Sequence, residues 1–285
     1  MTQVTFTPRS DLRSIADLRS SWTLGAVEPG SDVTIDLSKW RQAAPSVLVG
    51  LIAAIGKLAR HGCRITIKRP NNRYALRLLD TAGWRDALGT FGEWEWHSDL
   101  GPPIRRILPL LPIHNFKTFT DVENLVGSLE TEFLKSGKLP GNLLQDVSLV
   151  LAEAADNVIW HANCPEGGFA LAQVRQRQIF GEDHWFVEVA VADAGRGISA
   201  SLGKTDDREA ISLAFEEGVT GTDAPTRGYG LAEIRATALS GPERLVTIHS
   251  GHGLVAKGFG YDLSREVTAR FDGTLVAVEI PVKFR

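Results

Sequence analysis

The chain has 285 residues, of which 43% are hydrophobic and 23% are charged, and its formal net charge is −3 at pH 7. This composition excludes a disordered or fibrous protein, and the length fits two compact domains. The charge leaves no basic excess that would hold nucleic acid phosphates by counterion release.

Segments that would direct the chain to a membrane or out of the cell are not recognisable. No apolar run approaches the roughly 20 residues that span a bilayer, and residues 1–14 lack the apolar core of a secretory signal. The two cysteines, Cys63 and Cys164, lie far apart and lack metal-ligand spacing. We therefore predict a cytoplasmic protein that binds neither membranes nor nucleic acid directly.

The first part of the chain alternates between strand and helix patterns. The expected elements are a strand, a long apolar helix, a half-buried strand and a second helix, at residues 33–36, 46–60, 63–69 and 73–82. This order predicts a small α/β domain with parallel strands over residues 1–92.

The residues that follow change in character. Residues 93–115 are rich in Trp and Pro and show no clean period, so we predict a connecting segment there. In residues 116–285 we expect helices at 121–135, 141–161, 208–217 and 231–239, and strands at 168–176, 185–192, 244–250 and 274–282. Helices on one side and strands joined by hairpin-like turns predict a two-layer α/β (α+β) sandwich.

The helix predicted at residues 141–161 carries two polar residues that suit cation chemistry. Glu153 and Asn157 lie four positions apart, on one edge of the apolar stripe. An amide oxygen beside a carboxylate suits a Mg²⁺ site with a base that activates water. The alternative is a solvated Glu–Asn pair, which is common on helices.

A second polar group follows the strand predicted at residues 185–192. The Asp193 carboxylate can accept a hydrogen bond from an exocyclic amine such as adenine N6, while Gly195 and Gly197 let the backbone pass close to a flat base. Taken alone, the segment reads as an ordinary turn that contains Asp and Gly.

A third segment, Arg227-Gly228-Tyr229-Gly230-Leu231, opens a helix after a loop rich in Gly, Thr and Asp. Free N–H groups at a helix start form an anion site that suits phosphate oxygens. The P-loop pattern is absent from the sequence. The alternative is a glycine-rich turn before a helix.

In this order and spacing, the three segments resemble the GHKL ATPase family, which includes gyrase-type, Hsp90-type, sensor-kinase and anti-sigma-factor kinase domains. The resemblance covers residues 116–285, including the ending FDGTLVAVEIP. It implies a GHKL-type sandwich that binds ATP with Mg²⁺.

The resemblance also implies roles for individual residues. Glu153 would be the general base, Asn157 the Mg²⁺ ligand and Asp193 the acceptor for adenine N6, with Gly195 and Gly197 flanking the base. Phosphate contacts would come from Arg227, Gly228, Tyr229, Gly230 and Leu231. Thr274 would assist adenine recognition through water, and the segment from Ser199 to Arg227 would be a mobile lid.

Residues 33–84 resemble STAS domains, the fold of anti-sigma-factor antagonists. In that family an Asp-Ser pair near the start of the first long helix supplies a phosphorylatable serine. Here the corresponding residues are Ala44-Pro45-Ser46. The Asp is absent and Pro45 takes the usual place of the serine, so a phosphorylation switch at Ser46 is not expected. A proline there also suits the first turn of a helix.

We therefore expect a Mg²⁺-dependent, ATP-binding regulatory protein that hydrolyses ATP slowly and whose lid controls a protein partner. The alternatives are a protein serine kinase of the anti-sigma type, acting on a STAS-domain partner, and a binding module without turnover. A sensor histidine kinase fits less well, because no helical hairpin with a phosphoacceptor His precedes the pocket. Expected partners are ATP or ADP, a STAS-domain or sigma-factor-type regulator, and a second copy of the chain in a homodimer.

Overall fold

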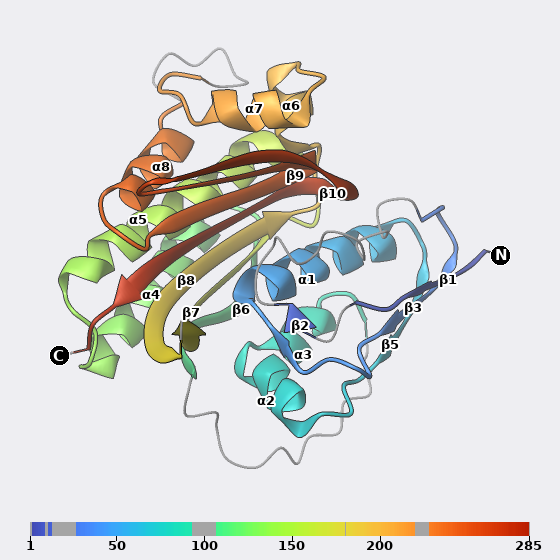
Figure 1. Cartoon of the computed structure of the whole chain (residues 1–285). Coiled ribbons are helices and arrows are strands. Elements are labelled where there is room, and N and C mark those ends of the chain that lie inside the picture. Colours follow the sequence, from blue (N-terminus) through green and yellow to red (C-terminus); the bar gives the residue numbers. More distant parts are fainter. Residues whose placement is uncertain are drawn as a thin grey trace.

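The structure is a computed structural model that describes residues 2–8, 11–12, 27–92, 107–179, 181–219 and 228–284. Its first part, residues 2–92, is referred to below as the N-terminal half, and residues 107–284 as the C-terminal half (Figure 1). Among the described residues, no helix is both long enough and apolar enough to cross a membrane.

The N-terminal half contains a three-stranded parallel sheet with the order β1-β3-β5. Its strands are β1 (Gln3–Phe6), β3 (Asp32–Asp36) and β5 (Arg64–Lys68), and a short parallel pair joins β2 (Asp11–Leu12) to β4 (Gln42–Ala43). The helices are α1 (Pro45–Arg60), α2 (Arg73–Thr81) and α3 (Trp84–Gly89). The prediction of parallel strands joined through helices is confirmed.

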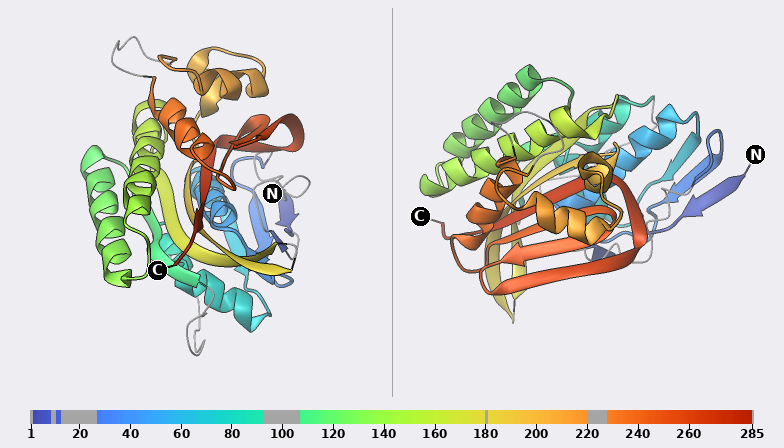
Figure 2. Two further views of the ribbon diagram at one scale, coloured as in Figure 1. Left: turned by 60° about the vertical axis from the view of Figure 1, so that its left-hand side comes forward. Right: turned by 90° about the horizontal axis from the view of Figure 1, so that it is seen from above.

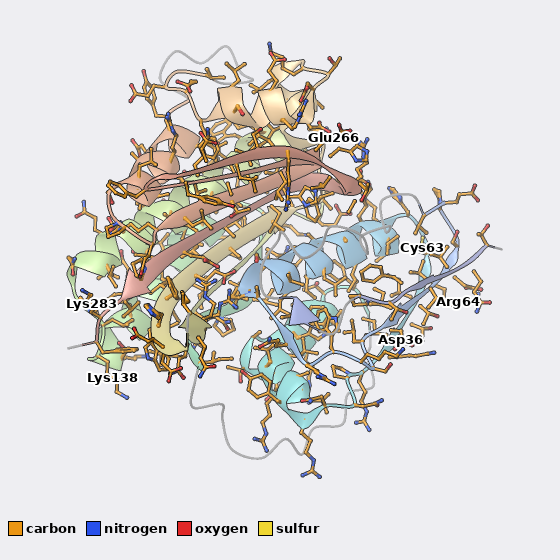
Figure 3. The ribbon with its side chains drawn as sticks, viewed as in Figure 1. Asp36, Cys63, Arg64, Lys138, Glu266 and Lys283 are labelled. Atoms are coloured by element: carbon orange, nitrogen blue, oxygen red, sulfur yellow. The ribbon has the colours of Figure 1, made fainter. Side chains whose placement is uncertain are left out.

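Local signals explain where the first two helices begin. Pro45 occupies the first turn of α1, where its missing N–H costs nothing. The Asn72 side chain caps α2 by accepting hydrogen bonds from the backbone N–H groups of Tyr74 and Ala75, at 2.8 and 3.2 Å. Charged side chains such as Arg64 project from the outer face of the small sheet (Figure 3).

The C-terminal half contains a five-stranded antiparallel sheet with the order β6-β7-β8-β10-β9. Its strands are β6 (Ile107–Phe116), β7 (Gly168–Ile179), β8 (Glu182–Asp193), β9 (Leu245–Gly258) and β10 (Tyr261–Val282). The helices are α4 (Phe119–Ser136), α5 (Asn142–Asn157), α6 (Gly197–Leu202), α7 (Asp207–Ala214) and α8 (Gly230–Leu239), and α5 continues into a π-helical turn, η3 (Val158–Ala162). Helices α4, α5 and α8 cover one face of this sheet, which gives the mixed α/β sandwich predicted for a GHKL-type domain.

Helix α1 covers the opposite face of the five-stranded sheet, for which no covering element was predicted (Figure 2). It lies between the two sheets, so that nearly all of its residues from Pro45 to Leu58 are buried. Side chains of α1 share one hydrophobic core with inward-facing residues of the large sheet, such as Leu171, Ala190 and Leu275. The two halves therefore bury apolar surface against each other.

Three sequence expectations need correction. The connecting segment without secondary structure expected at residues 93–115 is wrong from Ile107 onward, because β6 pairs with β7 there. Strand β6 is an edge strand, where proline is tolerated. Residues 251–273 extend the expected closing strands into a longer hairpin, and residues 197–214 form two helices where one was expected.

Candidate functional site

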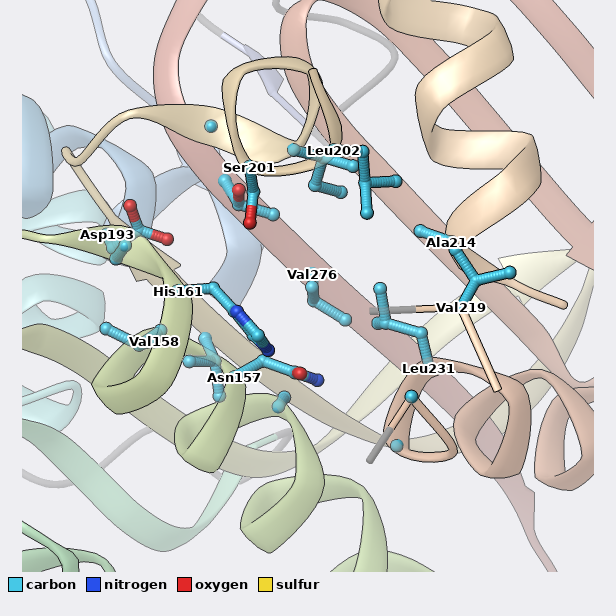
Figure 4. Close-up of a pocket in the computed structure, with 18 residues that line it drawn as sticks. Asn157, Val158, His161, Asp193, Ser201, Leu202, Ala214, Val219, Leu231 and Val276 are labelled. Carbon is cyan, nitrogen blue, oxygen red and sulfur yellow. The ribbon is translucent and has the colours of Figure 1, made fainter. Parts of the chain in front are cut away.

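A cavity with about 720 Å³ of empty space, partly open to solvent, lies between α5, α6, α8 and the sheet. Figure 4 shows Asp193 on one side of it and Leu231 on the opposite side. Its walls are formed by Ala154, Asn157, Val158, His161, Ala162, Val191, Asp193, Gly197, Ile198, Ser201, Leu202, Ala214, Val219, Gly228, Gly230, Leu231, Thr274 and Val276.

The cavity brings together residues that the sequence singled out in separate segments. Those that line it are Asn157, Asp193, Gly197, Gly228, Gly230, Leu231 and Thr274. Glu153, Gly195 and Tyr229 do not line it, and Arg227 lies outside the described residues. Tyr229 is 47% exposed and precedes the first residue of α8.

Asp193 is the last residue of β8 and is almost completely buried. Because side chains alternate along a strand, it shares the α5 side of the sheet with Val191, and both line the cavity. Its Oδ1 accepts a hydrogen bond from the backbone N–H of Gly195 at 2.7 Å, and the backbone N–H of Thr274 also donates to this carboxyl. Burial raises the pKa of Asp193 to about 7, against the opposing effect of these two donors.

The turn after Asp193 packs against the end of the π-helical turn. The backbone N–H of Arg196 donates to the Ala162 carbonyl at 2.9 Å. A Cβ atom on Gly195 would lie 2.1 Å from that carbonyl oxygen, so only glycine fits. The Gly195 backbone thus packs against the end of η3 and donates a hydrogen bond to Asp193, and its place beside the base stays a prediction.

Gly197 opens α6 with a φ of +77°, a conformation that favours glycine. The next backbone N–H, that of Ile198, donates to Ser250 Oγ at 3.0 Å, and Ser250 Oγ donates to the Gly273 carbonyl at 2.8 Å. These bonds connect the start of α6 to the middle of β9 and β10.

Asn157 lies at the end of α5, and its side chain is held by its own helix. Nδ2 donates to the Glu153 carbonyl at 2.8 Å, which leaves Oδ1 as the atom able to bind a cation. No group of three or more His, Cys, Asp or Glu side chains suited to a metal occurs within the described part of the chain. A divalent cation beside Asn157 would therefore take further oxygen ligands from phosphates and water.

Glu153 lies beside the start of α8, at the edge of the cavity. A Cβ atom on Gly230 would lie 2.5 Å from Glu153 Oε2 and 3.2 Å from Asn157 Nδ2. Glycine at this position therefore lets the N-terminus of α8 approach both polar residues of α5. Burial raises the pKa of Glu153, and the nearby charges of Glu233 and Asp156 raise it further. A carboxyl with a raised pKa suits a general base.

Other wall residues were not identified from the sequence. Ser201 and Leu202 come from α6, whose six residues are too few to show a helical pattern of apolar side chains. His161 could have been found, because it follows Asn157 by four residues on the same helical course. Val191, Val276 and Leu202 add apolar wall to the cavity, as suits the faces of a flat aromatic ring.

Comparison with known proteins agrees with this geometry. Curated proteins give no match to the chain. Residues 119–238, from the start of α4 to near the end of α8, match the model of the family described as "Histidine kinase-like ATPase domain". The matched range includes most of the cavity walls but not Thr274 or Val276. This part of the chain is therefore similar to histidine kinase-like ATPase domains, and the similarity supports ATP binding by the C-terminal half.

Proposed function

We propose that the protein is an ATP-binding regulator that hydrolyses Mg²⁺-ATP slowly and signals its nucleotide state to a protein partner. The observation that carries the proposal is the convergence of Asn157, Asp193, Gly230 and Thr274, from separate parts of the chain, on one cavity. The match of residues 119–238 to the histidine kinase-like ATPase domain supports it.

The cavity offers different chemistry at its two ends. At one end Asp193 accepts a hydrogen bond from adenine N6, while Val191 and Val276 contact the base. At the other end the N-terminus of α8, with Gly228 and Gly230, presents backbone N–H groups to the phosphates. A helix N-terminus favours anions through its unpaired N–H groups and its dipole.

Hydrolysis requires a water molecule beside the γ-phosphate. Glu153 accepts a proton from this water while the water oxygen bonds to the γ-phosphorus. The bond between that phosphorus and the β–γ bridging oxygen breaks, and ADP leaves. Asn157 Oδ1 would hold Mg²⁺, which neutralises phosphate charge. The raised pKa of Glu153 makes its carboxylate a stronger base than an ordinary one.

Control of a partner through a lid over Ser199–Arg227 is part of the proposal. The described start of this range is fixed to the sheet by Asp207. Its Oδ1 accepts a hydrogen bond from Ser199, and its Oδ2 accepts one from the His252 backbone N–H at 2.7 Å. A STAS-like fold of the N-terminal half, the identity of the partner and a homodimer also remain predictions.

The test combines calorimetry with phosphate release. ATP, ADP and GTP are titrated into the protein with and without Mg²⁺, and turnover is followed with γ-labelled ATP in the presence of STAS-domain proteins. We expect a preference for adenine, Mg²⁺-dependent binding and free labelled phosphate. Label on a STAS protein would identify a serine kinase instead, and binding without turnover would identify a binding module.

Glu153→Ala separates hydrolysis from binding. We expect this variant to bind ATP nearly as tightly as the wild type and to lose hydrolysis, because the carboxylate acts on water and not on the nucleotide. Equal hydrolysis by the variant and the wild type would contradict the role of Glu153. The absence of heat with every adenine nucleotide would reject the whole proposal.

A further inference from the structure

The last turn of α1, in the N-terminal half, contacts two segments beside Asp193, one within β10 and one in the loop before β7. Lys57 Nζ lies 2.6 Å from Asp272 Oδ2, and Arg60 Nε lies 2.9 Å from Glu166 Oε1. The Asp272 and Glu166 side chains are only 12% and 11% exposed. The Lys57 and Arg60 side chains are 24% and 36% exposed, so these pairs are screened less than fully exposed ones.

The first connection runs from Lys57 through the irregular part of β10 just before Thr274. Asp272 precedes Gly273, whose φ of +107° and close approach to β8 exclude a side chain, because a Cβ atom would lie 2.2 Å from the Asp193 carbonyl oxygen. The next residue, Thr274, pairs with Asp193 in the sheet and donates its N–H to the Asp193 carboxyl. Lys57 thus anchors a residue two positions from this donor.

The second connection runs from Arg60 through the loop after the π-helical turn. Glu166 binds Arg60 through Oε1, while its Oε2 lies 3.2 Å from Cys164 Sγ, which donates to it. The backbone N–H of Ala194, directly after Asp193, donates to the same sulfur. Burial and the contact with Glu166 raise the pKa of Cys164 to about 12, so it remains a thiol at neutral pH.

We propose that Lys57 and Arg60 are positioning residues for Asp193, so that the N-terminal half sets the affinity and selectivity of the cavity for adenine. This inference rests on the proposed ATP binding. Asp193 accepts hydrogen bonds from the backbone N–H groups of Gly195 and Thr274, so its position follows the backbone on either side. A binding group held within about 0.5 Å is needed for full selectivity.

Coupling between the two halves acts in both directions. If α1 positions Asp193, then adenine bound at Asp193 stabilises the contact between α1 and the sheet. A partner that loosens this contact lowers the affinity of the cavity for ATP. Bound ATP in turn lowers the affinity of the protein for that partner by the same factor. This gives the N-terminal half a direct means of regulating the cavity.

The experiment measures ATP, ADP and GTP binding by calorimetry to the full chain and to Lys57→Met, Lys57→Arg and Asp272→Asn. We expect Lys57→Met and Asp272→Asn to bind ATP and ADP about 5- to 20-fold more weakly. GTP binding should change less, so that the ATP-to-GTP selectivity falls. Lys57→Arg should restore most of the affinity, because it keeps the charge.

Lys68→Met is the matched control. Lys68 lies in the same half and pairs with Asp36 at 3.6 Å, but its side chain is 58% exposed and neither residue lines the cavity. We expect unchanged nucleotide affinity. Thermal unfolding shows whether each variant is folded. If Lys57→Met does not fold, Asp272→Asn provides the test, because this substitution removes the charge with almost no change of shape.

The outcomes separate this inference from the proposed function. A wild-type protein that binds no adenine nucleotide overturns both. If the wild type binds ATP and Asp193→Asn weakens binding, but Lys57→Met and Asp272→Asn change neither affinity nor selectivity, then only the positioning role is overturned. An equal loss of ATP and GTP binding also overturns it, because a general structural defect does not distinguish the two bases.

Discussion

The two faces of the five-stranded sheet bury polar side chains in opposite ways. On the face covered by α5 and α8, Asp193 lies at a cavity and can still accept a hydrogen bond from a ligand. On the face covered by α1, the buried Glu188 bonds to Arg175 at 2.6 Å and to the Ser46 backbone N–H at 3.1 Å. Asp193 can therefore accept a further hydrogen bond from a ligand, whereas the partners of Glu188 all come from the protein itself.

The comparison shows how one set of strands serves both purposes. Successive residues of a strand point to opposite faces, so Glu188 faces α1 while Val187 and Val189 face α5. The N-cap residue of α1, Ala44, has no side chain able to cap the helix. Glu188, from β8, binds the N–H of Ser46 in its place. The N-terminal half therefore depends on the C-terminal half for a helix cap as well as for apolar contact.

Glu188→Ala provides the strongest test of this dependence. We expect the free energy of unfolding to fall by about 3–5 kcal/mol, because Arg175 loses its closest charged partner in a buried site. Urea unfolding followed by tryptophan fluorescence and by circular dichroism measures the loss. Asp36→Ala, which breaks a more exposed pair, should cost under about 1 kcal/mol. Two separate transitions, with only one of them shifted, would contradict a shared core.

On the opposite face of the sheet, the role of Asp193 is tested by measuring how ATP affinity depends on pH. Its pKa of about 7 is raised by burial, and a hydrogen bond from adenine favours the ionised form. Affinity for ATP is thus nearly complete at pH 8, falls to about half at pH 7 and falls by about a further fivefold between pH 7 and 6. Calorimetry from pH 6 to 8 measures it.

Asp193→Asn is the control for this pH profile. Loss of a charge-assisted hydrogen bond should weaken ATP binding by about 10- to 150-fold. Titration of the nucleotide phosphates affects both proteins equally, so the difference between their profiles reports Asp193. Parallel profiles would show that the carboxyl does not titrate in this range or does not contact the base.

Ser46→Ala should have the smallest effect. Its contact with Glu188 uses the backbone N–H, which alanine retains, so we expect a loss of under about 1 kcal/mol in urea unfolding. Ser46 is buried at the start of α1, between the two sheets. Mass spectrometry after incubation of the folded chain with serine kinases should find this residue unmodified, and a phosphate there would contradict the packing.

Sequence periodicity was sufficient for the elements with a strong pattern of their own. The helix with Glu153 and Asn157 and the strand before Asp193 are where the pattern placed them. Several of the residues that the family resemblance singled out line the same cavity. The position of α1 on the large sheet was not predictable from the sequence. Because α1 is apolar on almost every side, its pattern does not indicate which element packs against it. Strand β6 was missed because prolines interrupt its alternation.

The bond between Ser46 and Glu188 joins residues 142 positions apart. During synthesis α1 therefore emerges long before β8 and β10, which supply its cap and one of its two sheet surfaces. Until those strands are made, the apolar side of α1 that they cover has no native partner, which exposes it to chaperones and proteases. The first half of this protein is made early but completes its folding late.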